Sequence, residues 1–187
     1  MARVFVDTNV LFPFSLMDLM LTLSEDRVHT MVWSDRLLDE WEHVIVREQR
    51  RTAQSAALIT ATIREFFQED RVPAAAYKDL LAEIDGPDPD DIHHMAAAVA
   101  GDAGTLITWN LGDFPTGVLG PKGITVTPPD PYLCTLLDQQ PAEVLLAIGR
   151  IAHRKQRPPM TAYDICDALA RAGTPVFAQR ARRLLDG

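Results

Sequence analysis

Residues 4–11 read Val-Phe-Val-Asp-Thr-Asn-Val-Leu, and the order of residue types in this stretch indicates how the chain is built. Its three apolar residues form a short run of the β type. The run stops at Asp7, Thr8 and Asn9, polar residues that favour turns and helix starts. We therefore expect a strand that passes directly into a helix, and the apolar spacing extends this helix to about residue 26.

The same alternation of strand and helix recurs further along the chain. Strands are expected at 29–33, 105–109 and 124–127, and helices from Ser34 to about 51, around 53–69 and 73–83, and from Ile92 to about Ala100. Strands that alternate with helices predict an α/β fold with a parallel sheet covered on both faces. We expect four to five strands, with Trp33 and Trp41 in the core.

After residue 128 the pattern becomes purely helical. The expected helices lie at about 130–138, 141–155, 161–172 and 174–185. The sequence therefore predicts an α/β domain at residues 1–128 and a helical C-terminal extension at residues 129–187 packed on it.

Composition excludes several classes of protein. The chain has 187 residues, of which 47% are hydrophobic and 24% charged, as in ordinary globular proteins. No stretch approaches the roughly 20 apolar residues that span a bilayer, and Asp7 comes too early for a signal peptide. Cys134 and Cys166 lie far apart in helical segments, which suits a reducing compartment. We expect a cytoplasmic protein without a membrane partner.

The charge is unevenly distributed. The net charge of −8 argues against a general polyanion binder. Residues 141–187 contain 8 basic and 4 acidic side chains, a net +4 that leaves −12 for residues 1–140. This split suits an acidic metal-binding core whose polyanionic substrate is held elsewhere, although charge alone favours ordinary solvated helix faces.

The most informative acidic residues stand where predicted elements change. Asp7 ends the first strand, and Glu40 lies in the helix after the second. Asp90 and Asp91 open the helix before the third strand, and Asp113 follows that strand. Binding sites in open parallel sheets collect beyond the carboxyl ends of the strands. Carboxylates that converge there raise one another's pKa unless a cation is bound. Oxygen ligands favour Mg²⁺ or Mn²⁺, which suit phosphoryl chemistry.

Each of these residues also has a plain structural interpretation. Asp7 can act as a helix N-cap, and Glu40 can be a surface glutamate. Asp90 and Asp91 can form a turn with favourable charge at a helix N-terminus, and Asp113 can stop a turn.

His93 and His94 are adjacent in a predicted helix, so their side chains point about 100° apart and do not easily share one ion. We expect one to face solvent and the other to pack or hydrogen-bond.

Four stretches, at residues 4–11, 32–40, 88–98 and 106–115, together resemble the PIN-domain family of metal-dependent ribonucleases. This resemblance implies a PIN-like parallel sheet with flanking helices. It further implies that Asp7, Glu40 and Asp91 bind Mg²⁺ or Mn²⁺. Many family members have an aspartate where this chain has Asn110, so the resemblance leaves the fourth acidic position to Asp113.

The resemblance also implies roles for neighbouring residues. Thr8 and Asn9 would orient ligands or the scissile phosphate, and Asn110 would bind a metal-bound water. Arg36 and the C-terminal arginines are candidates for holding the RNA backbone. Trp109 could stack on a base or fill the core.

Within the family, the chain most resembles the toxins of VapBC-type toxin–antitoxin pairs. This implies an endoribonuclease that is neutralised by a protein antitoxin and forms a homodimer. The alternatives are a PIN-fold nuclease in RNA processing or DNA repair without a toxin role, and a non-catalytic α/β binding module. A receiver or phosphatase fits less well, because Lys122 is badly placed for a receiver and Asn9 replaces a required aspartate.

Overall fold

A computed structural model describes residues 1–186 and has a parallel four-stranded sheet at its centre. The strands are β1 (Ala2–Val6), β2 (His29–Val32), β3 (Thr105–Ile107) and β4 (Thr125–Thr127), in the order β2-β1-β3-β4. The expected parallel α/β sheet is confirmed, with four strands in the described part of the chain. β1 is central because it pairs with β2 on one side and β3 on the other. Its Val4, Phe5 and Val6 are fully buried, as in a strand that is covered on both faces.

Helices follow the strands in nearly the expected ranges. Those of the first part are α1 (Thr8–Leu11), α2 (Phe14–Glu25), α3 (Asp35–Arg47), α4 (Ala53–Phe66), α5 (Ala74–Tyr77), α6 (Pro89–Ala100) and α7 (Thr116–Leu119), with 3-10 turns η1 (Gln68–Asp70), η2 (Asp79–Ala82) and η3 (Gly120–Lys122). The C-terminal helices are α8 (Pro129–Gln139), α9 (Pro141–Arg154), α10 (Ala162–Arg171) and α11 (Pro175–Leu185).

Two expected helices are broken. The segment up to residue 26 divides into α1 and α2 because Pro13, in an extended conformation, precedes the first residue of α2. The expected helix at 73–83 divides into α5 and η2. Apolar periodicity alone did not locate either break.

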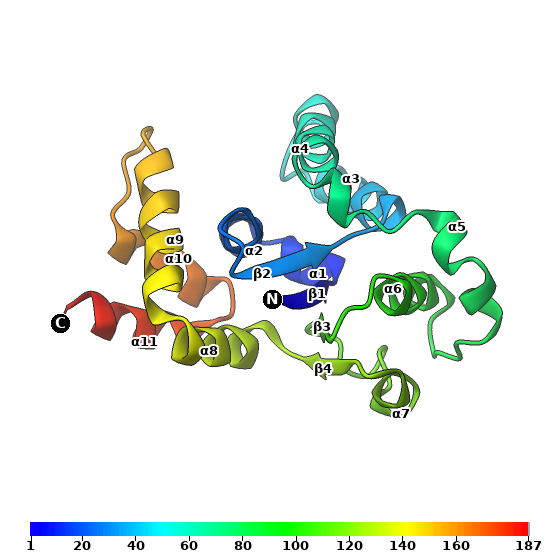
Figure 1. The fold of residues 1–187 in the computed structure, drawn as a ribbon. Helices are drawn as coiled ribbons and strands as arrows, with labels where there is room; N and C mark the ends of the chain where they lie inside the picture. The colour runs from blue at the N-terminus through cyan, green and yellow to red at the C-terminus, as the bar shows by residue number, and fades with distance from the viewer. Residues whose placement is uncertain (187) are drawn as a thin grey trace.

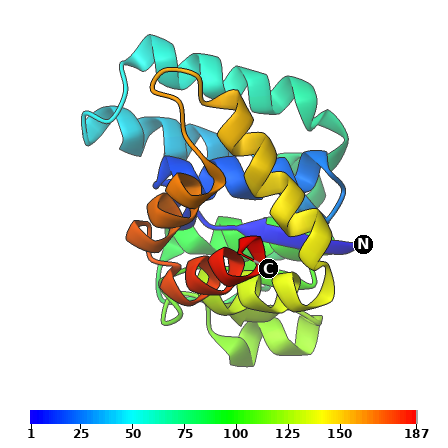
Figure 2. The ribbon, with the colours of Figure 1, turned by 90° about the vertical axis from the view of Figure 1, so that its left-hand side faces the viewer.

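The helices form a layer on each side of the sheet. Figure 1 shows α6 and α2 on opposite sides, with α8–α11 gathered on the side away from α5 and α6. Figure 2, seen from the C-terminal helices, shows α9 crossing in front of α2. The carboxyl ends of the strands face a hollow that is lined by side chains of α1, α3 and α6.

Specific contacts join the C-terminal helices to the sheet layer. His29 at the start of β2 lies 2.7 Å through Nδ1 from the hydroxyl of Tyr132 in α8. Arg150 and Arg154 of α9 donate to Glu25 at the end of α2. Cys134 and Cys166, both in helices, are free thiols. No helix within residues 1–186 has the length and apolar character needed to cross a membrane.

Candidate metal centre

Asp7 lies at the carboxyl end of the central strand. Its backbone N–H donates to the carbonyl of Ile107 at 2.9 Å, which places it beside the end of β3. The side chain is only 5% exposed, and its Oδ2 accepts a 2.7 Å hydrogen bond from the hydroxyl of Thr108. Asp7 also occupies the N-cap position of α1, but its carboxylate makes no capping hydrogen bond. The side chain is therefore directed to the sheet edge, not to the helix end.

Thr108 is the residue that organises this edge, and our sequence analysis did not identify it. It is fully buried directly after β3, and its Oγ1 accepts from the N–H of Asn110 at 2.9 Å and from Asn9 Nδ2 at 3.3 Å. Asn9 Oδ1 in turn accepts from the N–H of Trp109 at 3.3 Å. Thr108 thus links the residues after β3 to Asp7 and Asn9. A polar residue at a strand end was the only sequence signal for it.

Three acidic residues open α6, and each is used differently. Asp88 caps the helix by accepting from the N–H of Asp90 at 2.8 Å. Asp90 is exposed and forms a 2.8 Å ion pair with Arg36. Asp91 faces Asp7, and its partial burial together with the Asp7 carboxylate raises the pKa of Asp91 to about 6. Only Asp91 of the three belongs to the cluster at the sheet edge.

Glu40 approaches the same cluster from α3. This helix starts at Ser34, whose hydroxyl accepts from the N–H of Leu37, and buries Leu37 and Trp41 in the core. Glu40 is directed toward the strand ends. Burial alone would raise its pKa, but contact with His94 outweighs burial and lowers the pKa of Glu40 below its usual value. Glu40 is therefore ionised at neutral pH.

His94 lies at the centre of the cluster. It is fully buried, with Nδ1 3.6 Å from Asp7 Oδ1 and Nε2 3.1 Å from Glu40 Oε2. Neither ring nitrogen makes a well-aligned hydrogen bond in the part of the chain that the structure describes. Burial alone would lower its pKa, but the carboxylates of Asp7 and Glu40 raise the pKa of His94 to about 9. His93, as expected, diverges from it and lies edge-on to Tyr77 at the surface.

Asp113 and Asn110 lie on the outer side of the cluster, in the turn after β3. The N–H of Asp113 donates to the carbonyl of Asn110 at 3.1 Å, and both residues line the same pocket as Asp91. The negative charge of Asp113 adds to the rise in the pKa of Asp91. Thr8 is buried beside Glu40, and its hydroxyl contributes to the lowered pKa of that glutamate.

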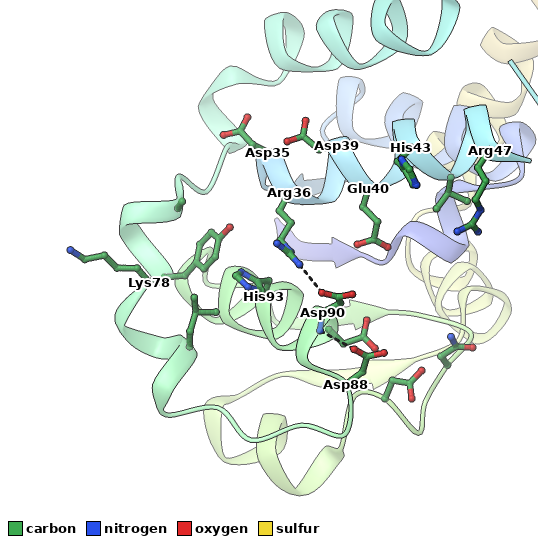
Figure 3. A pocket seen from close by; sticks show the side chains of 17 residues that line it. Asp35, Arg36, Asp39, Glu40, His43, Arg47, Lys78, Asp88, Asp90 and His93 are labelled. Atoms are coloured by element: carbon green, nitrogen blue, oxygen red, sulfur yellow. Dashed lines mark hydrogen bonds and ion pairs between the residues drawn. The ribbon is translucent and has the colours of Figure 1, made fainter. Parts of the chain in front are cut away.

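Two adjoining hollows reach the cluster. The smaller, about 320 Å³, is lined by Asp7, Thr8, Asn9, Phe12, Glu40, Val44, Asp91 and Asn110. The larger, about 850 Å³, runs between α3 and the α5–α6 side and also contains Glu40, Asp91, Asn110 and Asp113. Figure 3 shows Arg36 and Glu40 projecting from α3 toward the side that carries Asp88 and Asp90. The cluster is therefore accessible to a ligand.

The donor set fits a divalent cation. One oxygen of Asp7, one oxygen of Asp91 and one ring nitrogen of His94 lie within 4.8 Å of one another. The imidazole of His94, which has no aligned hydrogen bond in the described residues, and the raised pKa of Asp91 both indicate a site whose polar groups are incompletely satisfied by the protein alone. A divalent cation would supply the missing partner and charge.

The tryptophans and arginines that could bind substrate differ in exposure and in ion pairing. Trp33 and Trp41 are fully buried as expected, whereas Trp109 is 37% exposed beside the cluster. The C-terminal Arg150, Arg180 and Arg182 form ion pairs with nearby carboxylates. Arg50 stacks on Phe12, which lines the smaller hollow.

Comparison with known proteins gives two family matches and one relative. A family model described as "PIN domain" matches residues 3–112, and one described as "VapC50 C-terminal domain" matches residues 129–183. The chain is 35% identical over 111 residues to "Putative ribonuclease VapC50" of Mycobacterium tuberculosis. That alignment covers 59% of this chain and 64% of the relative, which is less than two thirds of its length. No solved structure gives a significant match.

Proposed function

This chain belongs to the PIN-domain family, and from this premise we propose that it is a metal-dependent endoribonuclease and the toxin of a bacterial toxin–antitoxin pair. The observation that carries the proposal is the juxtaposition of Asp7 and Asp91 at the carboxyl ends of the strands, with Glu40 beside them. The relative named as a ribonuclease supports the reaction class.

We propose Asp7, Glu40, Asp91 and Asp113 as the residues that hold Mg²⁺ or Mn²⁺, directly or through water. A bound divalent cation would polarise the scissile phosphate and lower the pKa of the attacking water. The protein contributes the orientation of the ligands. Thr108 fixes one oxygen of Asp7 by its 2.7 Å hydrogen bond, so that Asp7 cannot turn away from the hollow.

Substrate positioning falls to the residues around the hollows. Asn9 and Asn110 are held by Thr108 and Trp109, and we propose that their amides orient the scissile phosphate or a water molecule. The metal-binding acids repel a polyanion, so phosphates away from the cleavage site need cations. Arg50, just after α3, stacks on Phe12 of the smaller hollow, and the neighbouring Arg51 stacks on Phe14, so we propose both as phosphate contacts.

For the complete protein, we propose an RNA substrate, a protein antitoxin, a homodimer and a cytoplasmic location. The match of residues 129–183 to the C-terminal domain model of VapC50 supports the toxin assignment. We also retain the division into residues 1–128 and 129–187 as a proposal.

The first experiment is cleavage of a mixed RNA pool with Mg²⁺ or Mn²⁺. We expect metal-dependent cleavage that EDTA stops and that Asp91→Asn abolishes. Asp90→Asn is the matched control, because Asp90 is the adjacent acid but forms an exposed pair with Arg36. Equal cleavage by both variants would reject the assignment of Asp91. A folded wild-type protein that neither cleaves RNA nor binds Mn²⁺ would favour a non-catalytic binding module.

A second experiment separates a toxin from a processing nuclease. Expression of the wild-type chain in a bacterium should arrest growth, and Asp7→Asn should relieve the arrest. Co-expression of a small protein encoded beside it should also restore growth. Cleavage in vitro without growth arrest would favour the processing nuclease.

A further inference from the structure

His94 stands one helical turn after Asp91 and on the same face of α6. Residues three apart on a helix are neighbours, so a carboxylate and an imidazole at this spacing can serve one metal ion. The ring is fully buried and packs 5.7 Å from the ring of Phe5 in β1. His94 is thus held rigidly between the helix that carries Asp91 and the strand that leads to Asp7.

Each ring nitrogen of His94 faces a carboxylate, but neither has an aligned hydrogen bond within residues 1–186. Nε2 is 3.1 Å from Glu40 Oε2 and Nδ1 is 3.6 Å from Asp7 Oδ1, yet neither pair has hydrogen-bond alignment. A fully buried polar group without an aligned partner is rare in proteins and calls for an explanation. The nitrogens are directed at two carboxylates that we propose as metal ligands.

We infer that His94 is a metal ligand: Nδ1 would release its proton to solvent and bind the cation shared by Asp7 and Asp91, while Nε2–H faces Glu40 Oε2 at 3.1 Å. Nδ1 lies 3.6 Å from Asp7 Oδ1, and one ring nitrogen lies within 4.8 Å of an oxygen of Asp7 and one of Asp91, so a single cation could reach all three side chains. A carboxylate that holds the second nitrogen of a metal-binding histidine is a recurrent arrangement in metalloproteins. Glu40 occupies that position here.

This inference rests on the proposed function and refines the choice of metal. Mg²⁺ takes oxygen ligands in nearly all its protein sites, whereas imidazole binds Mn²⁺ and the later transition metals more readily. A centre of Asp7, Asp91 and His94 should therefore prefer Mn²⁺ over Mg²⁺ more strongly than a centre built from carboxylates alone.

The direct test is electron spin-echo envelope modulation of the Mn²⁺-loaded full-length protein. A bound imidazole nitrogen gives a ¹⁴N modulation that changes when all five histidines are ¹⁵N-labelled. The signal should persist in His93→Gln and disappear in His94→Gln. His93 is a matched control, because it is the adjacent histidine and lies against Tyr77 away from the cluster.

Metal affinity gives a second readout. By titration calorimetry, His94→Gln should lose about 10- to 100-fold in Mn²⁺ affinity and much less in Mg²⁺ affinity, whereas His93→Gln should match the wild type. Labelling of the wild-type protein keeps the test valid if His94→Gln fails to fold. Mn²⁺ binding that depends on Asp91 but lacks an imidazole signal would overturn the histidine ligand and leave the proposed function intact. Absence of Mn²⁺ binding would overturn both.

Discussion

At the scale of single residues, the position of Asp91 makes the metal-free protein electrostatically unfavourable. The pKa of Asp91 rises to about 6 because of burial and the neighbouring Asp7. Above that pH the charged Asp91 carboxylate lies close to the Asp7 carboxylate in the folded state, whereas in the unfolded chain the two are far apart and solvated. Stability is therefore lost as the pH rises from about 4 to above 6.

Asp91→Asn should consequently stabilise the metal-free protein at pH 8, by about 1 kcal/mol once solvent screening is allowed for. Thermal unfolding in EDTA measures this gain. Added Mn²⁺ should then stabilise the wild type but not the variant. Asp90→Asn serves as control and should retain the metal response. Mn²⁺ stabilisation of Asp91→Asn would contradict the assignment.

Thr108 gives the second prediction at this scale. Thr108→Val preserves the shape of the side chain but removes the hydrogen bond to Asp7 and leaves the N–H of Asn110 without its acceptor. We expect a loss of about 1–3 kcal/mol in the free energy of unfolding, together with weaker Mn²⁺ binding. Thr125→Val on the exposed edge strand β4 is the control, and an equal effect of both would argue against a special role for Thr108.

At the scale of elements, β2 and α8 are joined through a buried histidine. His29 lies 2.7 Å from the Tyr132 hydroxyl and donates through Nε2 to the carbonyl of Met20 at 3.0 Å. Burial lowers the pKa of His29 to about 4. Between pH 6.5 and 4 the unfolded chain takes up a proton at His29 that the folded protein does not, so stability falls as the pH falls.

The lowered pKa of His29 should reduce the free energy of unfolding by about 2 kcal/mol between pH 7 and pH 5. Urea unfolding of the wild type and His29→Gln at both pH values measures it. The variant is expected to be less stable at pH 7 but less sensitive to acid. His153→Gln changes an exposed histidine and should follow the wild-type pH dependence. An unchanged acid sensitivity in His29→Gln would reject this explanation.

The end of α3 supplies the prediction for RNA binding. Arg50 and Arg51 stack on Phe12 and Phe14, and neither forms an ion pair within residues 1–186. Arg50 thus lies against Phe12 of the hollow that contains Asp7, and Arg51 follows it in the chain. Counterion release makes such contacts sensitive to salt.

Replacement of Arg50 and Arg51 by Gln should weaken RNA binding about tenfold at low salt and reduce the slope of log affinity against log salt by about 1.4 for two contacts. Fluorescence anisotropy in the Asp91→Asn background avoids cleavage. Replacement of Arg150 and Arg154, which are paired with Glu25, is the control. A larger effect of the control pair would restore the C-terminal arginines as the RNA contacts.

At the scale of the whole molecule, the C-terminal helices contact the loop beside the metal centre. Gly173, between α10 and α11, has φ of +103°, and a Cβ there would lie 2.9 Å from the Trp109 ring. Trp109 directly follows Thr108, which orients Asp7. The turn between α10 and α11 therefore packs against Trp109 and helps to fix the loop after β3.

Gly173→Ala should destabilise the protein by about 1–3 kcal/mol, because alanine is strained at this φ and meets the Trp109 ring. Urea unfolding followed by tryptophan fluorescence measures the loss, and Mn²⁺ titration reports any displacement of the centre. Gly149→Ala is the control. Gly149 lies in α9 with open space around it, so alanine should stabilise there. Equal stability of wild type and Gly173→Ala would contradict the proposed packing.

The sequence by itself determined the architecture. Short runs rich in apolar and β-branched residues and bounded by turn formers predicted the strands, and their alternation with helices predicted parallel pairing. The same reasoning placed Asp7 and the pair Asp90 and Asp91 where elements change, and the resemblance to the PIN-domain family selected Asp91 from this pair. These predictions succeed because local periodicity and capping depend on residues close together in the chain, although they missed the break at Pro13.

Only the tertiary structure decided which groups meet. The hydrogen bond from Thr108 to Asp7 joins residues about a hundred positions apart, and the approach of His94 to Glu40 joins two different helices. Burial then determines the chemistry, because a histidine enclosed by two carboxylates differs from its neighbour His93 at the surface. These side chains meet because the sheet and its helices pack together in a particular way. No local pattern in the sequence specifies that packing.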